Sequence, residues 1–342
     1  MIRAILSDRR LLPMKFMSPS LSSIAAAVMF ATPAICMAQT YPAKPIRATI
    51  GTPTGGPGDV VLRGAGQAIQ DALGQPFVVE NRVSVSGIVS AEACSKAAPD
   101  GYQLCSCDQQ TMAINQYTRS SLPYSPADMT PIALYGFLAA GIHVHPSVPA
   151  NTLQELVALA KAKPGSIPFG TYGVTSASHL YIEWWKKARG IEFLNVPYKA
   201  ASFAWPAMLG GEVQVSYFAL TGAAVNIVKA GKARTLMVAL EQRFADLPNV
   251  PTYREAGLEF PLVTWFGLCA PAKTPRDIIS RLNAEVSHGL LNNPGMKAKF
   301  VTSQGIQSDA PSGGSPEAFG QLIAAEQKRY QELVKITGVR EE

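Results

Sequence analysis

This sequence predicts an α/β fold built on two mainly parallel sheets. Short apolar runs alternate with amphipathic helical patterns along most of the 342-residue chain. Such alternation is typical of parallel sheets whose faces are covered by helices. The 304 residues that follow the first 38 are enough for two ordinary domains, each with its own core.

The elements are justified in order by apolar periodicity and by the residues that begin or end a helix. Gly74 closes the first helix, and Thr152 with Glu155 forms a capping box that opens another. Pro275 and Ser315 mark two later helix starts. The expected strands are 46–50, 77–79, 102–107, 167–170, 213–217 and 233–240, and the expected helices are 60–73, 87–98, 153–160, 176–189, 274–291 and 315–333.

Residues 1–38 are typical of a secretory signal peptide. A basic start precedes an apolar run at 21–35, and Cys36 and Ala38 place small side chains at a cut before Gln39. The run is too short for a membrane span, and bulky Ile35 disfavours lipidation of Cys36. The sequence therefore predicts a periplasmic protein. Its start codon stays open among Met1, Met14 and Met17.

Composition and charge indicate which class of partner is not expected. The formal net charge is +6, and +3 of it lies in the first 38 residues. No Lys/Arg cluster is interleaved with aromatic residues, so we expect no nucleic-acid partner.

Four cysteines lie beyond the signal: Cys94, Cys105, Cys107 and Cys269. A chain of this size does not depend on disulfides, so we interpret them first as small buried hydrophobic residues. A Cys94–Cys105 or similar bridge is the alternative, because secretion permits disulfides. A Cys-x-Cys pair alone does not predict a metal site.

The glycine-rich segment 51–59 connects the first strand to the first helix. Its glycines let backbone N–H groups turn toward a guest, and the helix N-terminus favours an anion. It lacks the spacing of the Walker or dinucleotide-binding loops. A tight turn that merely needs glycine is the alternative. For Asp59 the alternative is a first-turn acid paired with Arg63.

A second strand-to-helix loop, 170–179, gathers hydroxyl groups. Either Thr175 or Ser176 caps the following helix, or the hydroxyls and free amides hold a second anionic group. Ser178 and His179 are sequence neighbours and do not make a catalytic pair, and no Gly-x-Ser-x-Gly elbow is present.

The histidines and tryptophans favour ordinary structural roles. His143 and His145 share a strand face without an evident third metal ligand, so we interpret them as surface residues. The tryptophans (Trp184, Trp185, Trp205 and Trp265) are interpreted as packing residues. We expect no metal and no cofactor.

From residue 41 to its end the chain resembles the Bug, or tripartite tricarboxylate transporter, substrate-binding receptors. The order and spacing of several short motifs carry the resemblance. They are YPAKPIR at 41–47, VENR at 79–82, APDGY at 98–102, LPYSP at 122–126, LAKAKPG at 159–165, SHL at 178–180, VPYK at 196–199, LGGEV at 209–213, KAGK at 229–232 and WFGL at 265–268.

The resemblance implies a type II-like periplasmic-binding-protein fold. Two α/β lobes, 39–141 plus 263–342 and 142–262, would be joined by crossing hinge strands and would close on a ligand in the cleft between them. Such receptors capture small organic carboxylates and deliver them to a membrane permease of one large and one small subunit. We expect a monomer without enzymatic activity.

The ligand-binding residues implied by the resemblance lie on the two loops and at one strand end. They are Thr52, Pro53, Thr54, Gly55, Gly56, Gly58, Asp59, Thr171, Tyr172, Val174, Thr175, Ser176, Ala177, Ser178 and Ala219.

Several of these positions depart from the family pattern. Thr52 replaces an aromatic residue, Thr54 a proline, and Ala219 an aspartate. Segment 83–88 loses most of the family's glycines and its asparagine, and 174–177 reads Val-Thr-Ser-Ala in place of Asn-Gly-Ser-Thr. We therefore expect a ligand bulkier or less charged than a plain dicarboxylate.

Two other functions stay open at this point. A receptor that docks on a membrane signalling partner would use the same closure of two lobes. A periplasmic enzyme on this fold would need an activated nucleophile or a metal cluster, and the sequence shows neither.

Overall fold

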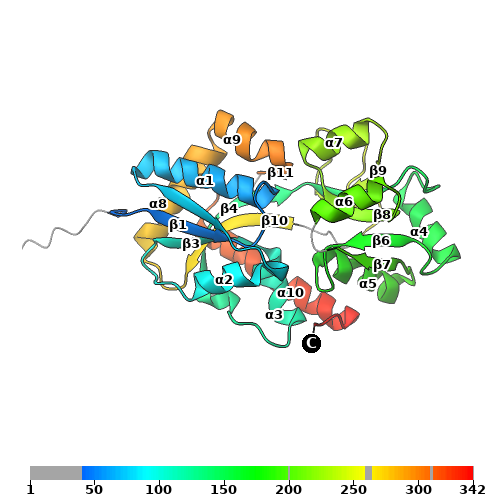
Figure 1. Cartoon of the computed structure of the whole chain (residues 1–342), viewed down its shortest axis with the longest axis horizontal. Coiled ribbons are helices and arrows are strands. Elements are labelled where there is room, and N and C mark those ends of the chain that lie inside the picture. Colours follow the sequence, from blue (N-terminus) through cyan, green and yellow to red (C-terminus); the bar gives the residue numbers. More distant parts are fainter. Residues whose placement is uncertain (1–40, 199–200, 259–263, 309–310, 342) are drawn as a thin grey trace, which may run out of the picture. The chain divides into compact units, whose positions relative to one another are not determined.

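The computed structural model describes residues 41–198, 201–258, 264–308 and 311–341. Their strands form one sheet in the order β11-β4-β10-β3-β1-β2 and a second in the order β7-β6-β8-β5-β9 (Figure 1). The signal peptide expected at 1–38 lies outside the described residues. None of the helices described is both long enough and apolar enough to span a bilayer.

Helices cover both faces of the first sheet. Helices α1, α8 and α9 lie on one face and α2, α3 and α10 on the other (Figure 1). The strands are β1 (Ile46–Ile50), β2 (Phe77–Asn81), β3 (Gln103–Asp108), β4 (Met129–Leu138), β10 (Thr264–Pro271) and β11 (Ile306–Gln307). The helices are α1 (Pro57–Leu73), α2 (Ile88–Ser95), α3 (Asn115–Thr118), α8 (Arg276–Val286), α9 (Pro294–Phe300) and α10 (Pro316–Thr337).

The second sheet is also covered on both faces. Helices α4 and α5 contribute to the core on one face, and α6 and α7 to smaller clusters on the other. The strands are β5 (Ala140–Val144), β6 (Pro168–Thr171), β7 (Leu194–Pro197), β8 (Val215–Ala219) and β9 (Arg234–Val238), and the helices are α4 (Leu153–Ala162), α5 (Ala177–Arg189), α6 (Ala201–Leu209) and α7 (Gly222–Lys229).

Strand direction differs from the sequence-based expectation, because both sheets are mixed. Strands β1 and β6 have parallel neighbours, whereas β10 runs antiparallel to β3 and β4, and β5 antiparallel to β8 and β9. The chain passes from β4 to β5 through the single residue Ala139. Strands β4, β5 and β10 are buried along nearly their whole length, so they lack the alternating pattern that marks a half-buried strand.

Helix boundaries confirm most of the capping signals. Helix α1 ends at Gly74, whose φ of 73° is the left-handed C-cap conformation. It begins at Pro57, three residues before the expected start, because proline is well suited to the first helical turn. The Thr152 hydroxyl accepts from the Glu155 amide, while the Glu155 carboxylate reaches the Asn151 amide rather than that of Thr152.

Helix α10 packs into two hydrophobic cores. Near its start, Phe319 and Ile323 pack with Trp265 of β10 in a cluster of the first sheet. Near its end, Leu333 and Val334 join the main cluster of the second sheet, together with residues of α5. One helix thus contributes apolar side chains to the packing of both sheets.

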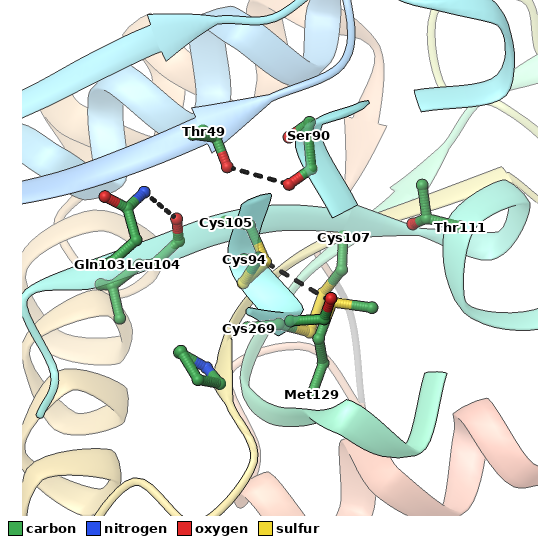
Figure 2. Close-up of a disulfide and its surroundings, with 12 residues drawn as sticks. Thr49, Ser90, Cys94, Gln103, Leu104, Cys105, Cys107, Thr111, Met129 and Cys269 are labelled. Atoms are coloured by element: carbon green, nitrogen blue, oxygen red, sulfur yellow. Dashed lines mark hydrogen bonds between the residues drawn. A yellow bond between two sulfur atoms is a disulfide. The ribbon is translucent and has the colours of Figure 1, made fainter. Parts of the chain in front are cut away.

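The four cysteines form two disulfides, so their interpretation as small buried hydrophobic residues without a bridge is wrong, and the alternative of a Cys94–Cys105 bridge is confirmed. Cys94 of α2 is bonded to Cys105 of β3, and Cys107 of β3 to Cys269 of β10 (Figure 2). Their Cα atoms are 5.8 and 6.0 Å apart. Cys105 and Cys107 are two residues apart on a strand and so point to the same face, where both partners lie. The expectation of burial is confirmed, since all four side chains are buried.

Candidate functional site

The first loop runs from the end of β1 to the start of α1 and packs against the turn that precedes α2. A Cβ atom on Gly51 would lie 2.5 Å from the Cα of Gly87, so only glycine fits there. Gly55 has a φ of +84°, a conformation that favours glycine. Two of the loop's glycines are therefore required by backbone geometry, as the tight-turn interpretation expects.

Asp59 is buried, and its carboxylate forms hydrogen bonds that fix the first loop to α1 and β2. Its carboxylate accepts hydrogen bonds from the Gly55 amide (2.9 Å), from Arg63 (3.0 Å) and from the Asn81 side chain (2.8 Å). Burial raises the pKa of Asp59, but hydrogen bonds from Arg63, Gly55 and Asn81 and the charge of Arg63 outweigh it, so the pKa is lowered. The pairing with Arg63 proposed as the structural alternative is confirmed.

The start of α1 has no side-chain cap. Its N-cap residue is Gly56, and Pro57 at the next position has no N–H group. The amides of Gly58 and Asp59 belong to the first turn, where no intrahelical acceptor is available. The Thr52 hydroxyl is buried and has no hydrogen-bond partner within the described ranges. An anion at this position would meet unpaired donors and the positive end of a 17-residue helix.

The second loop uses its hydroxyl groups internally. The Ser176 Oγ accepts from the His179 amide, donates to the Gly173 carbonyl and lies 3.0 Å from the Ser178 Oγ. Ser176 is thus the N-cap of α5, as the structural alternative expects. The Thr171 hydroxyl donates to Asn195 at 2.7 Å. The amides of Ala177 and Ser178, in the first turn of α5, have no intrahelical acceptor.

Two amide side chains that were not predicted connect the turn beside the first loop to the second loop. Asn115 donates to the carbonyl of Ser86, in the turn beside the first loop, at 2.9 Å. Gln110 donates to Asn115 at 2.8 Å and to the carbonyl of Thr175, in the second loop, at 3.4 Å. The sequence carries one signal, because Asn115 directly follows the apolar run Met112–Ile114. The structure shows that Asn115 is fully buried, and a buried amide needs hydrogen-bond partners.

Of the remaining predicted residues, Thr54 and Val174 lie within these loops and Ala219 lies at the end of β8. Val174 is 52% exposed, Thr54 is exposed, and Ala219 ends β8 half-buried. Burial raises the pKa of Tyr172 far above its ordinary value. Two pockets of the described structure lie elsewhere, one beside Met112 and Gln327 and one beside Phe203, and none of the predicted residues lines either.

One histidine interpretation is wrong. His143 is fully buried in β5, where its Nε2 lies 3.3 Å from the Phe218 carbonyl and its Nδ1 lies 2.9 Å from the Thr235 hydroxyl. Burial lowers its pKa to about 4. Among the described residues no group of three His, Cys, Asp or Glu side chains could hold a metal ion.

Comparison with known proteins identifies the family of this chain. A family described as "Tripartite tricarboxylate transporter family receptor" matches residues 61–339. The chain belongs to this family. The receptor is 31% identical over 306 residues to protein BugT of Bordetella pertussis strain Tohama I. This match covers 89% of this chain and 92% of BugT.

Solved structures agree in fold over nearly the same span. A periplasmic transporter is 32% identical to the receptor with a TM-score of 0.77, covering 88% of this chain and 99% of the other. Rpa4515 of R. palustris, solved with adipate, is 28% identical with a TM-score of 0.78, covering 87% and 98%. The protein is therefore a periplasmic solute-binding receptor, of a family whose members are binding proteins rather than enzymes.

Proposed function

We propose that the receptor binds a small organic carboxylate between the first and second loops and delivers it to a membrane permease of one large and one small subunit. The observation that carries this proposal is the uncapped start of α1 at Gly56. A carboxylate there would accept from first-turn amides, as an Asp or Ser side chain does at other helices. The adipate complex of the R. palustris relative is consistent with this ligand class.

The organisation proposed for this function follows the family. Residues 1–38 would be a signal peptide, 39–141 plus 263–342 one lobe, and 142–262 the other, in a monomer. The amides at the start of α5 would bind a second polar group of the ligand, while Asp59 and Ser176 would shape the two loops around it. This division of roles agrees with the internal hydrogen bonds of both side chains.

We also propose that the ligand has an apolar body. Val83 and Val85, in the turn beside the first loop, are 60% and 69% exposed, and Val174 of the second loop is 52% exposed. Exposed apolar side chains on ligand-binding loops favour an apolar partner. Thr52, where the family has an aromatic residue, leaves room for a larger group.

The substitution Gly56→Asp tests the anion site. Gly56 has an ordinary extended conformation, and an added Cβ would lie 3.5 Å from the Pro53 carbonyl oxygen, an unstrained contact. The new carboxylate would cap α1 and take the position proposed for the ligand. We expect no loss of thermal stability but at least a tenfold weaker affinity for adipate and for longer or aromatic monocarboxylates, consistent with loss of about 1.5–3 kcal/mol from charge-assisted hydrogen bonds.

Gly56→Ala is the matched control, because it adds the Cβ without an acceptor. It should bind the same carboxylates as the native receptor. The measurement is a thermal-shift screen followed by calorimetric titration, on protein freed of ligand by unfolding and refolding. Equal carboxylate affinity of the Gly56→Asp variant and the native receptor would remove the start of α1 from the site.

A further inference from the structure

The segment that follows α10 is anchored beside the second loop. Helix α10 ends at Gly338, and Val339 is buried in the core of the second sheet. The Glu341 amide then donates to the Thr118 carbonyl at 2.7 Å, and Glu341 forms a parallel β-bridge with Arg119. The backbone of Glu341 is therefore held at a defined place, at the end of α3.

Arg119 and Glu341 form an ion pair there. The Arg119 Nη2 lies 2.7 Å from the Glu341 Oε2, and the Arg119 side chain is only 14% exposed. Neither its Nε nor its Nη2 has an aligned hydrogen-bond partner among the residues described, so the contact with Glu341 is an ion pair. A guanidinium so largely removed from water needs a counter-charge, and Glu341 supplies it. The pair thereby restricts the orientation of the Glu341 carboxylate.

The same carboxylate oxygen contacts the second loop. The Thr175 Oγ1 donates to the Glu341 Oε2 at 3.5 Å, and Thr175 is buried. Its carbonyl accepts from Gln110 on the other side of the residue. Thr175 comes directly before Ser176, the cap of α5, so a restraint on Thr175 restrains the loop amides that the proposed function assigns to the ligand.

We propose that Arg119 and Glu341 are positioning residues, which hold the second loop in its ligand-binding conformation through the Thr175 hydroxyl. Neither residue is required to touch the ligand. The effect on affinity rests on the proposed function, whereas the effect on the loop does not. Without the Glu341 carboxylate, the Thr175 side chain would lose this acceptor, and the Thr175 backbone would keep the 3.4 Å hydrogen bond from Gln110.

Hydrogen exchange of the ligand-free receptor tests this proposal directly. The rate is followed for residues 172–180 in the native protein, in Glu341→Gln, in Thr175→Val and in the double variant. Each single change should raise the exchange rate of this segment about two- to tenfold, because Thr175→Val removes the hydroxyl donor and Glu341→Gln removes the charge that pairs with Arg119 and orients the acceptor. The double variant should exchange no faster than the faster single variant, because both changes break the same contact.

Two controls separate positioning from general destabilisation. Glu92→Gln removes one negative charge from an exposed pair with Lys96, away from the loop, and should leave the exchange of 172–180 unchanged. Arg119→Lys, which retains the cation, should exchange more slowly in this segment than Arg119→Met. Exchange in the later turns of α5, residues 183–189, should be the same in all variants.

Unchanged exchange in Glu341→Gln, or effects of the two single changes that add fully in the double variant, would overturn the proposal. A calorimetric titration with adipate then measures the consequence, and Glu341→Gln should bind it about two- to tenfold more weakly. If neither adipate nor the longer or aromatic monocarboxylates bind the native receptor, the ligand class proposed above is contradicted, and the exchange data still decide the positioning role.

Discussion

At the residue scale, the polar side chains of Asp59 and Ser176 form hydrogen bonds with other groups of the protein. Asp59 accepts from Gly55, Arg63 and Asn81, and Ser176 contacts Gly173, Ser178 and the His179 amide. These hydrogen bonds explain why glycine-rich and hydroxyl-rich loops can keep one shape. They also indicate that backbone amides, more than side chains, are available to a ligand.

Also at the residue scale, the burial of His143 makes the free energy of unfolding depend on pH. Its folded-state pKa of about 4 lies below the ordinary 6.5, so the unfolded chain binds the proton more tightly. Its contribution to stability is complete above about pH 6.5 and is lost as the pH falls toward 4. Over this range the native receptor should lose up to about 1.4 kcal/mol per pH unit more than His143→Gln.

Urea unfolding of both proteins at pH 7, 6 and 5 measures this difference. The variant will be less stable at pH 7, because the contacts with Thr235 and Phe218 are altered, so the comparison is between slopes. Parallel pH profiles would show that His143 is protonated as easily in the folded protein as in the unfolded chain.

At the element scale, helix starts decide which donors are available. Helix α5 is capped by Ser176 and α4 by Thr152, whereas the N-cap residue of α1 is Gly56, which has no side-chain acceptor. A cap fixes both the helix end and the approach of the preceding loop. A side-chain cap thus satisfies a first-turn amide of α4, whereas the first-turn amides of α1 have no side-chain acceptor.

A comparison of two caps separates stability from binding. Ser176→Ala and Thr152→Ala should each lower the free energy of unfolding by about 0.5–2 kcal/mol. Only Ser176→Ala should also weaken carboxylate binding, because it loosens the loop proposed to hold the ligand. Denaturant unfolding and calorimetry on the two variants check this, and equal carboxylate affinity in both would argue against a role for the second loop.

At the scale of the whole molecule, contacts between residues distant in sequence hold the fold together. Helix α10 packs into the cores of both sheets, and the Cys107–Cys269 bond joins residues 162 positions apart. The Cys94–Cys105 bond spans only 11 positions. Closing a longer loop removes more entropy from the unfolded chain.

The two disulfides should therefore contribute unequally to stability. In the chain-entropy model, replacing Cys107 and Cys269 by serine should cost about 5 kcal/mol, against about 3 kcal/mol for Cys94 and Cys105. Melting temperatures of the two double variants in non-reducing buffer measure the difference. A larger loss for the Cys94 and Cys105 pair would mean that local packing outweighs loop entropy.

The sequence by itself determined the features that depend on neighbouring residues. The strand at 46–50, the glycine that ends α1, the Ser176 cap and the Asp59–Arg63 pair were all predictable, because helix periodicity and capping act over a few residues. The order and spacing of its motifs also led to the receptor family, which the family match at 61–339 confirms.

Only the tertiary structure decided what distant segments do together. The Cys107–Cys269 disulfide, the antiparallel strand β10, the burial of His143 and the bridging amides of Gln110 and Asn115 all depend on partners far along the chain. Fully buried strands carry no alternation, and a cysteine or an amide does not reveal its partner by spacing. Because folding brings those partners together, their interactions could be read only from the folded chain.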